Sequence, residues 1–515
     1  MEKFYDTLSV CPYCLKVVKA VVYEEDGAVY IEKECREHGK FKHVYWSDAE
    51  MFKRAFLYKA DGKGLENPQV KENLKGCPYD CGLCPLHKSH TALGLIDVTN
   101  RCNLHCPICF AAAFAKGYVY EPSLNQVKAM LDLLRNNKPV PCPAVQLTGG
   151  EPTLREDLVE MVRYAKEVAG FKHVEIDTNG IRIAKEDGYA EKLAEAGGTT
   201  IYLSFEGLEP KAYGHKGANL LNIKLKAIER CREAGIGVVL VPTLTKTIND
   251  DQPGKIIEFA AENVDVIRCV NFQPISFVGR FNPDDVNKYR ITIPEAIERI
   301  EKQTKGKIRK EDFYPVPTVV PLSRFIAAFE GEPKVEFSTH PCCGMATYIY
   351  VEEDGSYTPI TRFVKVDELL KLLKEETPLL EKGGKFTKLR VLIKVLRKLP
   401  SMVNKDELPP ELDITSLIKN LLVKRDYKAL AKFHLSRMIM IGMMHFQDSL
   451  NLDMERLMRC CIHYAVPDGR LIPFCAMNLT DIHGRGLYRK PIEEKYSIPL
   501  EEWEKIHGVP QSEPA

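Results

Sequence analysis

Cysteine residues carry most of the chemistry that this sequence offers. There are seventeen, and all but Cys142, Cys231 and Cys269 fall into four groups. Thiolates are soft ligands that bind zinc, iron and iron–sulfur clusters. An odd number of cysteines, in a chain that opens on MEKFYDTLSV rather than on an apolar signal segment, argues against a secreted disulfide scaffold. We therefore expect metal sites in a reducing cytoplasm, and we assign the three isolated thiols to the core.

The first group pairs Cys11-x2-Cys14 with Cys35-x2-His38. Between the two pairs, an alternating apolar pattern interrupted by Asp26-Gly27 predicts a β-hairpin. Two short ligand pairs held by a hairpin bring four donors into a tetrahedral arrangement, which suits one zinc or one iron ion. Residues 1–46 are thus expected to form a rubredoxin-like or zinc-ribbon-like domain. The alternative for His38 alone is a surface histidine.

The second and third groups share the spacing C-x3-C-x2-C. The third group, Cys102, Cys106 and Cys109, follows an apolar strand pattern at Gly94–Thr99, and a helix is expected from Phe110 onward. It therefore lies at the carboxyl end of a strand, where α/β enzymes place their sites. A cubane [4Fe–4S] cluster normally takes four thiolates, so a triplet leaves one iron open to an external ligand.

The other two groups predict one or two auxiliary [4Fe–4S] clusters. The second group is Cys77, Cys81 and Cys84, in an element expected over residues 47–92, and its fourth ligand stays open. The fourth group is made of two adjacent pairs, each followed by a D-G-x-x-x-P hairpin pattern, and one further cysteine: Cys342, Cys343, Cys460, Cys461 and Cys475. We expect residues 291–364 and 456–515 to form the two halves of this cluster-binding region. Which cysteine of each pair ligates stays open.

Between these groups, strand and helix patterns alternate. With Gly94–Thr99 they make six βα units over residues 93–290, which predicts an α/β fold with a partial (β/α)6 TIM-type barrel. Most of the strands end on polar residues or glycine, so one rim of the barrel is the expected site. The further strands are expected at Ala144–Leu147, His173–Asp177, Thr200–Phe205, Gly237–Pro242 and Val266–Phe272, and two of the helices at Leu124–Arg135 and Leu158–Val168.

Residues 365–455 are expected to form a helical insert. In Lys385–Leu399, apolar residues recur at helical spacing, and lysine and arginine fill the other side. This pattern fits either a solvated helix on a core or a helix at an anionic membrane surface. The methionines of Met438–Met444 suggest either ordinary core or the adaptable lining of an apolar channel.

The overall charge gives little indication of a partner. Lys and Arg number 72 against 71 Asp and Glu, which is a net charge of +1 and argues against a nucleic-acid binder. No stretch reaches the roughly 18 apolar residues that a membrane span needs. We expect a cytoplasmic protein that contacts the inner face of the membrane peripherally.

The paired motifs C-x3-C-x2-C and Gly149-Gly150-Glu151-Pro152 resemble the radical S-adenosylmethionine (radical SAM) superfamily. That resemblance implies a cluster on Cys102, Cys106 and Cys109 whose open iron chelates SAM, with reductive cleavage giving a 5′-deoxyadenosyl radical. It also implies that a strand-end set contacts SAM: Gly149, Gly150 and Glu151 the methionine amine, and Asp177, Thr178, Asn179, Ser204 and Glu206 the ribose and methionine. Ile108 departs from the aromatic residue that the superfamily often has there.

The layout from about Cys11 to Asn478 is most similar to the archaeal tetraether lipid synthases. This similarity implies coupling of terminal methyl carbons of two isoprenoid chains of diether lipids, with two SAM molecules used per bond. A sulfide of an auxiliary cluster would store the first alkyl radical, and a ferredoxin- or flavodoxin-like protein would supply electrons. A lipid substrate and contact with an anionic membrane follow from the same similarity.

Two alternatives remain open. The same group is linked to C-methylation of a dihydropterin in methanopterin biosynthesis, where Asn271 or Gln273 would hydrogen-bond a polar ring. A long apolar tunnel into residues 365–450 would favour the lipid, and a short polar pocket would favour the pterin. The other alternative is a non-catalytic iron–sulfur electron carrier, which would have no use for an amine-binding strand end.

Overall fold

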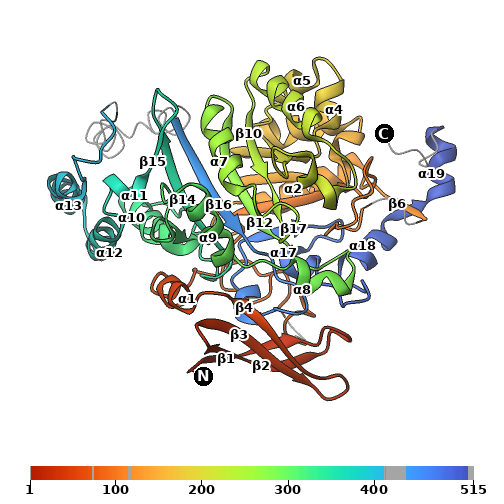
Figure 1. Cartoon of the computed structure of the whole chain (residues 1–515), viewed down its shortest axis with the longest axis horizontal. Helices are drawn as coiled ribbons and strands as arrows, with labels where there is room; N and C mark the ends of the chain where they lie inside the picture. The colour runs from red at the N-terminus through yellow and green to blue at the C-terminus, as the bar shows by residue number, and fades with distance from the viewer. Residues whose placement is uncertain (1, 72–74, 114–116, 411, 413–436, 509–515) are drawn as a thin grey trace.

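The computed structural model describes residues 2–71, 75–113, 117–410, 412 and 437–508 (Figure 1). The strands are β1 (Glu2–Val10), β2 (Val17–Glu25), β3 (Ala28–Cys35), β4 (Gly39–Trp46), β5 (Leu93–Thr99), β6 (Tyr118–Tyr120), β7 (Ala144–Gly149), β8 (His173–Thr178), β9 (Thr200–Ser204), β10 (Gly237–Val241), β11 (Thr243–Leu244), β12 (Ile267–Pro274), β13 (Tyr314–Pro315), β14 (Gly344–Val351), β15 (Tyr357–Pro359), β16 (Met438–Met444), β17 (Ile462–Ala465), β18 (Leu471–Pro473) and β19 (Ser497–Pro499). The α-helices are α1 (Ala49–Phe56), α2 (Leu124–Arg135), α3 (Leu158–Arg163), α4 (Ile181–Lys185), α5 (Tyr189–Glu195), α6 (Leu221–Glu233), α7 (Pro253–Glu262), α8 (Val286–Tyr289), α9 (Ile293–Gln303), α10 (Val320–Glu330), α11 (Ile360–Phe363), α12 (Val366–Lys382), α13 (Lys385–Lys398), α16 (Met454–Leu457), α17 (Phe474–Met477), α18 (Arg489–Lys495) and α19 (Leu500–His507).

The amino-terminal strands form a separate four-stranded antiparallel sheet in the order β1-β2-β3-β4, drawn in red in Figure 1. The predicted hairpin is confirmed, since β2 and β3 pair with Glu25 opposite Ala28 around the Asp26-Gly27 turn. Trp46 and Phe52 are buried beneath this sheet, with their rings 5.9 Å apart. The ribbon is therefore held by its own apolar core as well as by any metal.

A second, large sheet forms the body of the molecule. Its strand order is β13-β14-β16-β12-β10-β9-β8-β7-β5-β17-β18, and the run from β5 to β12 is parallel, which confirms the six predicted barrel strands. Alternate residues such as Val174 and Ile176 of β8 are buried against the covering helices. The residues between them, Glu175 and Asp177, face the other side of the sheet.

Side-chain contacts show that the sheet is curved. Tyr202 of β9 accepts hydrogen bonds on its hydroxyl from Asn271 Nδ2 and Gln273 Nε2 of β12, at 2.5 and 3.0 Å. Because β10 lies between β9 and β12, these side chains meet only on the inner face of a curved sheet. That inner face is polar, and we call it the concave face.

The carboxyl-terminal part extends the sheet at both edges. β16 pairs in parallel with β12, and β17 pairs in parallel with β5. The helical insert expected over residues 365–455 therefore does not include Met438–Met444, and of the two alternatives for its methionines the structure supports ordinary core. Ile439 and Ile441 alternate with methionines in a short, largely buried apolar run, which is typical of an inner strand, and β16 pairs in parallel with β12 and antiparallel with β14.

The helix predictions are confirmed in part. Leu124–Arg135 is helical as expected, and Leu158–Val168 is an α-helix that continues as one π-helical turn. The helix expected from Phe110 is absent over Phe110–Ala113, which form a turn. α13 is present, and on its apolar face Phe386 and Leu389 are 91% and 55% exposed, whereas Val391 and Val395 are buried. Residues 413–436 of the predicted insert lie outside the described residues. No helix in the described part is long and apolar enough to cross a membrane.

Candidate radical and cluster sites

The loop after β5 carries Cys102, Cys106 and Cys109, all partly buried. Cys109 and Arg280 exchange backbone hydrogen bonds of 3.1 and 2.9 Å, and the Arg280 guanidinium donates to the Cys106 carbonyl at 2.9 Å. Burial raises the pKa of the Cys106 thiol, while the nearby Lys216 ammonium opposes that shift. Three soft donors on one clamped loop, beside a cation, fit a cluster bound through three thiolates.

The glycines of the second motif are required by close backbone contacts. A Cβ on Gly149 would lie 2.2 Å from the Thr99 carbonyl oxygen, and one on Gly150 would lie 2.1 Å from the Arg101 carbonyl oxygen. Gly149 also has a φ of +131°, which L side chains rarely adopt. The end of β7 is thus packed against the segment that leads into Cys102. This contact fixes the position of the cysteine loop relative to the strand ends.

Glu151 is 1% exposed, and its carboxylate is occupied within the protein. Oε1 accepts hydrogen bonds from Thr153 Oγ1 and Thr178 Oγ1, both at 2.6 Å, and Oε2 accepts from the Asn179 backbone N–H at 2.7 Å. The side chain therefore ties the end of β7 to the end of β8. The carbonyl groups of this strand end remain as the groups able to bind an amine.

The other predicted SAM contacts lie around two lysines, of which Lys224 is buried and Lys216 is partly buried. Lys224 Nζ donates to the Asn179 carbonyl at 2.5 Å and to Ser204 Oγ at 2.9 Å. Glu206 is fully buried and is bound by Lys216 Nζ at 3.0 Å and His215 Nε2 at 2.9 Å. Burial alone would raise the pKa of Glu206, but the charges of Lys216 and His215 outweigh it and lower the pKa to about 2.

Asp177 lies deeper, on the concave face. Its Oδ2 accepts a hydrogen bond from Thr148 Oγ1 at 3.0 Å. Burial raises the pKa of Asp177 to about 7, with the Thr148 hydrogen bond opposing this and the charge of Glu151 adding to it. The structure thus separates Asp177 from Glu206. Among the described residues, Asp177 has no ion-pair partner, and the charge of the more distant Lys216 opposes the rise in its pKa. Glu206, in contrast, is in direct contact with Lys216 and His215.

Sequence reasoning missed Lys216, Lys224, His215 and Arg280. All four lie outside the motifs, on a short 3-10 helix, on α6 and on the loop after β12. A basic residue on a surface helix carries no sequence signal for burial, so none of the four was predictable from spacing.

The first cysteine group converges. The donor atoms of Cys11, Cys14, Cys35 and His38 all lie within 4.8 Å of one another, and His38 Nδ1 is 3.6 Å from both Cys11 Sγ and Cys35 Sγ. The Tyr13 ring stacks on the His38 ring at 5.3 Å. Three sulfurs and one imidazole nitrogen at this spacing fit a tetrahedral zinc or iron ion.

The second group lines a small pocket with His87. Cys77, Cys81 and Cys84 are joined there by Asp80, whose Oδ2 accepts from the Gly76 N–H at 2.6 Å. One nitrogen of the His87 ring, Nε2, lies 2.8 Å from the Cys460 carbonyl oxygen. Burial raises the pKa of Cys77 to about 12, and the Cys84 charge adds to this shift. Three thiols and one imidazole around one pocket fit an iron–sulfur cluster.

The fourth group comes from opposite edges of the large sheet. Cys343 precedes β14 at one edge, and Cys460 and Cys475 flank the β17–β18 hairpin at the other. Burial raises the pKa of Cys460 well above its ordinary value, and the charges of Cys475 and Cys343 add to the shift. The segment after β16 links the two cysteine loops, because the His445 N–H donates to the Cys343 carbonyl at 3.0 Å and the Gln447 N–H donates to Cys475 Sγ at 3.4 Å. The two edges of the curved sheet therefore bring these cysteines into one region, which Cys461 also borders.

The other cysteine of each adjacent pair, Cys342 or Cys461, is more deeply buried. Cys342 is 4% exposed within the apolar core. Cys461 is 1% exposed, and its Sγ lies 3.8 Å from the carbonyl oxygens of Glu336 and Arg459. The isolated Cys142 and Cys231 are buried in the apolar core, which confirms that assignment for these two. Cys269 is also buried, but it shares a face of β12 with Asn271 and Gln273 and so lies on the concave face.

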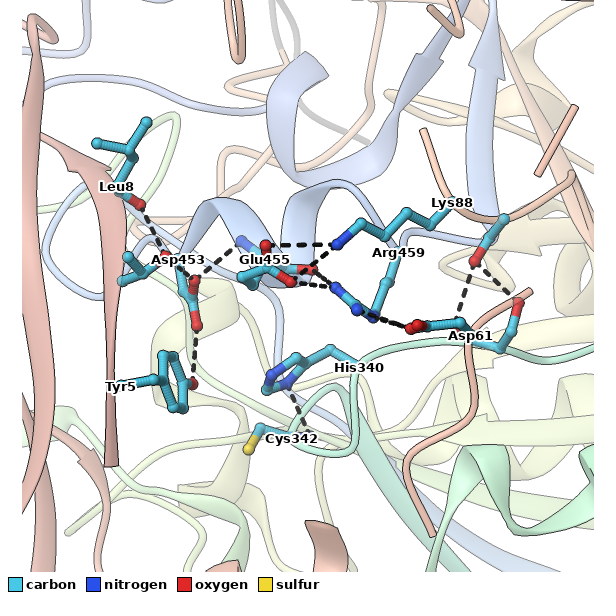
Figure 2. A network of polar contacts seen from close by, with 12 residues as sticks. Tyr5, Leu8, Asp61, Lys88, His340, Cys342, Asp453, Glu455 and Arg459 are labelled. Atoms are coloured by element: carbon cyan, nitrogen blue, oxygen red, sulfur yellow. Dashed lines mark hydrogen bonds and ion pairs between the residues drawn. The ribbon is translucent and has the colours of Figure 1, made fainter. Parts of the chain in front are cut away.

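Figure 2 shows the polar network that holds these cysteine loops. Asp453, which caps α16, accepts hydrogen bonds from the hydroxyls of Tyr5 and Tyr45 of the ribbon, both at 3.0 Å. At the other end of the network, Arg459 pairs with Asp61 at 2.7 Å. The segment that leads into Cys460 is thereby anchored to the ribbon and to the element that follows it.

Two family descriptions match the chain. The radical SAM superfamily matches residues 96–260, and the HMPTM N-terminal zinc ribbon domain matches residues 4–47. The chain is also 49% identical to the 7,8-dihydro-6-hydroxymethylpterin dimethyltransferase of Methanocaldococcus jannaschii, across 99% of this chain and 98% of that protein. The chain therefore belongs to the family of this dimethyltransferase, within the radical SAM superfamily. It is a radical SAM enzyme, as the motifs predicted, and the family binds SAM and a [4Fe–4S] cluster.

Other relatives of this radical SAM enzyme match it over a shorter length. It is 37% identical to the Fe-coproporphyrin III synthase of Methanosarcina barkeri over 36% of this chain and 44% of that protein. It is 30% identical to the GTP 3′,8-cyclase of Limosilactobacillus fermentum over 35% of this chain and 54% of that protein. Among solved structures, SuiB of Streptococcus suis bound to S-adenosylmethionine is 20% identical over 42% of this chain and 48% of that chain, with a TM-score of 0.32, too low to support an argument.

The expectation of a tetraether lipid synthase is wrong. A relative that matches this radical SAM enzyme over 99% of its length is a pterin methyltransferase, and the ribbon matches a domain described for HMPTM proteins. Of the two features that favoured lipid, the amphipathic helix α13 is present with Phe386 and Leu389 exposed, but no Met-rich helical channel is found among the described residues. Met438–Met444 is a strand of the sheet and not a helical channel lining, and the concave face carries Asp177, Tyr202 and Asn271 in place of a run of leucines.

Proposed function

We propose that this protein is a radical SAM C-methyltransferase that acts on a dihydropterin. The observation that carries the proposal is the 49% identity with a dihydropterin dimethyltransferase over nearly the full length of both chains. A match of this extent includes the ribbon, the barrel and both cysteine-bearing hairpins, and so does not rest on the shared barrel alone.

The polar concave face supports a heterocyclic substrate. A polar ring is selected by paired hydrogen-bonding groups, because a wrong ring leaves buried groups without partners. Tyr202, Asn271 and Gln273 form such a set on one wall, bonded to one another through the Tyr202 hydroxyl. Asp177 and Glu175 lie on the wall formed by β8.

When bound, the cluster and SAM supply a 5′-deoxyadenosyl radical that abstracts hydrogen from carbon. The residues of this chain hold the reactants. Arg280 clamps the loop of Cys106 and Cys109, Glu151 joins the ends of β7 and β8, and Lys224 ties Ser204 to Asn179. The curved sheet below these strand ends excludes bulk water from the reacting carbon.

The auxiliary sites belong to the same proposal. We assign one cluster to Cys77, Cys81 and Cys84, with His87 as the remaining donor in that pocket, and a second to Cys343, Cys460 and Cys475. The ribbon residues Cys11, Cys14, Cys35 and His38 hold one zinc or iron ion. Electrons come from a ferredoxin- or flavodoxin-like donor, as the sequence similarity implies.

The test is a product assay with reconstituted protein under anaerobic conditions. Two reactions are run, and both contain SAM, a strong reductant and 7,8-dihydro-6-hydroxymethylpterin. In the first, SAM is the only possible methyl source. In the second, a one-carbon-loaded reduced pterin is added as a further methyl source. We expect a pterin whose mass has risen by one or two methyl groups, together with 5′-deoxyadenosine. An unmodified pterin in both reactions, from protein with full cluster content, would overturn the proposal.

A further inference from the structure

Two neighbouring side chains on the concave face have polar atoms that nothing in the described structure uses. Gln146 of β7 and Glu175 of β8 are register partners on adjacent parallel strands. Val145 and Ile176, which flank them, are buried in the core beneath the helices, so Gln146 and Glu175 point to the opposite, concave side. One layer further along the strands, Asp177 is bonded by Thr148 on the same face.

Gln146 and Glu175 differ from Thr148 and Asp177, which are hydrogen-bonded to each other on the same face. Gln146 is 5% exposed, and its Nε2 has no hydrogen-bond partner among the described residues. Glu175 is partly buried and accepts no hydrogen bond from the part of the chain that the structure describes, and burial together with the charge of Asp177 raises its pKa to about 7. A buried amide donor without a partner is unfavourable and is rare in folded proteins. Its presence next to an open carboxylate indicates that a ligand completes the pair.

We propose that Gln146 and Glu175 bind the amino-pyrimidinone edge of the pterin. This inference rests on the proposed function. The edge presents a carbonyl oxygen, a ring N–H and an exocyclic amino group in a row, which is one acceptor followed by two donors. The Gln146 amide donates to the carbonyl, and the two oxygens of Glu175 accept from the ring N–H and the amino group.

The depth of the pair suits this orientation. Gln146 lies four residues before Gly150, and at about 3.3 Å per residue this places it roughly 13 Å below the strand end where SAM is expected. A two-ring heterocycle bound at Gln146 by its pyrimidine edge extends toward that strand end. Its saturated carbons, which are the positions with abstractable hydrogen, then lie nearest to the cluster loop. Tyr202 and Asn271 form the wall beside the rings.

Anaerobic binding of 7,8-dihydro-6-hydroxymethylpterin to the reconstituted full-length protein tests the assignment. Glu175→Gln keeps the shape of the side chain and removes one acceptor and the charge, so we expect the Kd to rise about 10- to 100-fold. SAM binding to the same variant should change less than twofold, which separates loss of an anchor from misfolding. Glu167→Gln, at an exposed position on the outside of the barrel, is the matched control and should leave both affinities unchanged.

A modified ligand gives a second measurement, and its wild-type arm does not depend on whether a variant folds. A pterin analogue without the 2-amino group should bind wild type about 10-fold more weakly and should bind Glu175→Gln about as well as the parent pterin does. If Glu175→Gln binds both pterins as tightly as wild type, the assignment of this edge is wrong while the proposed function stands. If wild-type protein binds no pterin, the proposed function itself fails.

Discussion

The backbone N–H of Asn179 donates a 2.7 Å hydrogen bond to the carboxylate of Glu151. This bond joins the end of β8 to the Gly-Gly-Glu end of β7, which in turn packs on the segment that leads into Cys102. The three parts of the proposed SAM site are thus held together by one buried carboxylate.

Glu151→Gln should loosen the two strand ends. The amide has only one oxygen to accept the bonds that both carboxylate oxygens now accept, and charged hydrogen bonds contribute about 1.5–3 kcal/mol each. We expect a loss of about 2 kcal/mol in the free energy of unfolding, measured by urea denaturation, and a weaker SAM affinity. Glu167→Gln is the control, and equal stability of the two variants would show that the buried bonds contribute nothing.

Gly150→Ala should disrupt the approach of β7 to the cysteine loop. The added Cβ would lie 2.1 Å from the Arg101 carbonyl oxygen, so the backbone must shift. At Gly214, the nearest atom to an added Cβ is 3.8 Å away. We therefore expect Gly150→Ala to lose SAM binding in an equilibrium titration, and Gly214→Ala to retain it. Retention by both variants would refute the packing role of Gly150.

The Glu206 ion pair should contribute a pH-dependent stability. Its folded pKa of about 2 lies below the ordinary value of 4.5, so the contribution is present above about pH 4.5 and is lost as the pH falls toward 2. At neutral pH, Glu206→Gln leaves Lys216 buried without its counter-ion, at a destabilisation of about 3–5 kcal/mol. The difference in unfolding free energy between wild type and variant should shrink between pH 4.5 and 3. A constant difference over that range would contradict the assignment.

The adjacent cysteines provide a matched pair of variants. Cys343 is partly exposed beside Cys460 and Cys475, whereas Cys342 is buried in the core. Cys343→Ala should lose the iron and the EPR signal of one auxiliary cluster, and Cys342→Ala should keep both. The reverse result would assign the ligand to the other member of the pair.

Removal of one ribbon ligand should release the ribbon metal without affecting the barrel. Cys35→Ala removes one of four converging donors, and we expect one equivalent of zinc or iron to disappear from metal analysis. Cys231→Ala, in a buried core position, should retain full metal content. Unchanged metal content in Cys35→Ala would refute the site.

Sequence patterns predicted the elements whose signals are local. The ribbon hairpin and the barrel strands followed from alternation and turn residues at Asp26-Gly27 and at the strand ends. The boundary of the helical insert was wrong at Met438–Met444, because a short apolar run is compatible both with a buried helix and with an inner strand. Lys216 and Arg280 were missed because their burial depends on contacts between segments far apart in the sequence.

The substrate was mistaken for a similar reason. The cysteine layout is shared by enzymes with different substrates, so it does not identify the substrate. The apolar, basic segment 385–399 favoured the lipid, but such a segment is also typical of a solvated helix on a core. Residues such as Gln146 and Glu175 distinguish a polar from an apolar site. They can be recognised as neighbours only from the strand register, which pairs them on one face of the sheet. The spacing of cysteines contains no information about that face.

The most direct test of the central claim is substrate-dependent 5′-deoxyadenosine formation by reconstituted protein with SAM and reductant. Three parallel reactions contain 7,8-dihydro-6-hydroxymethylpterin, a diether phospholipid in vesicles, or no added substrate. We predict that the pterin alone raises deoxyadenosine above the level without substrate and that its mass increases. Stimulation by the lipid and not by the pterin would contradict the account.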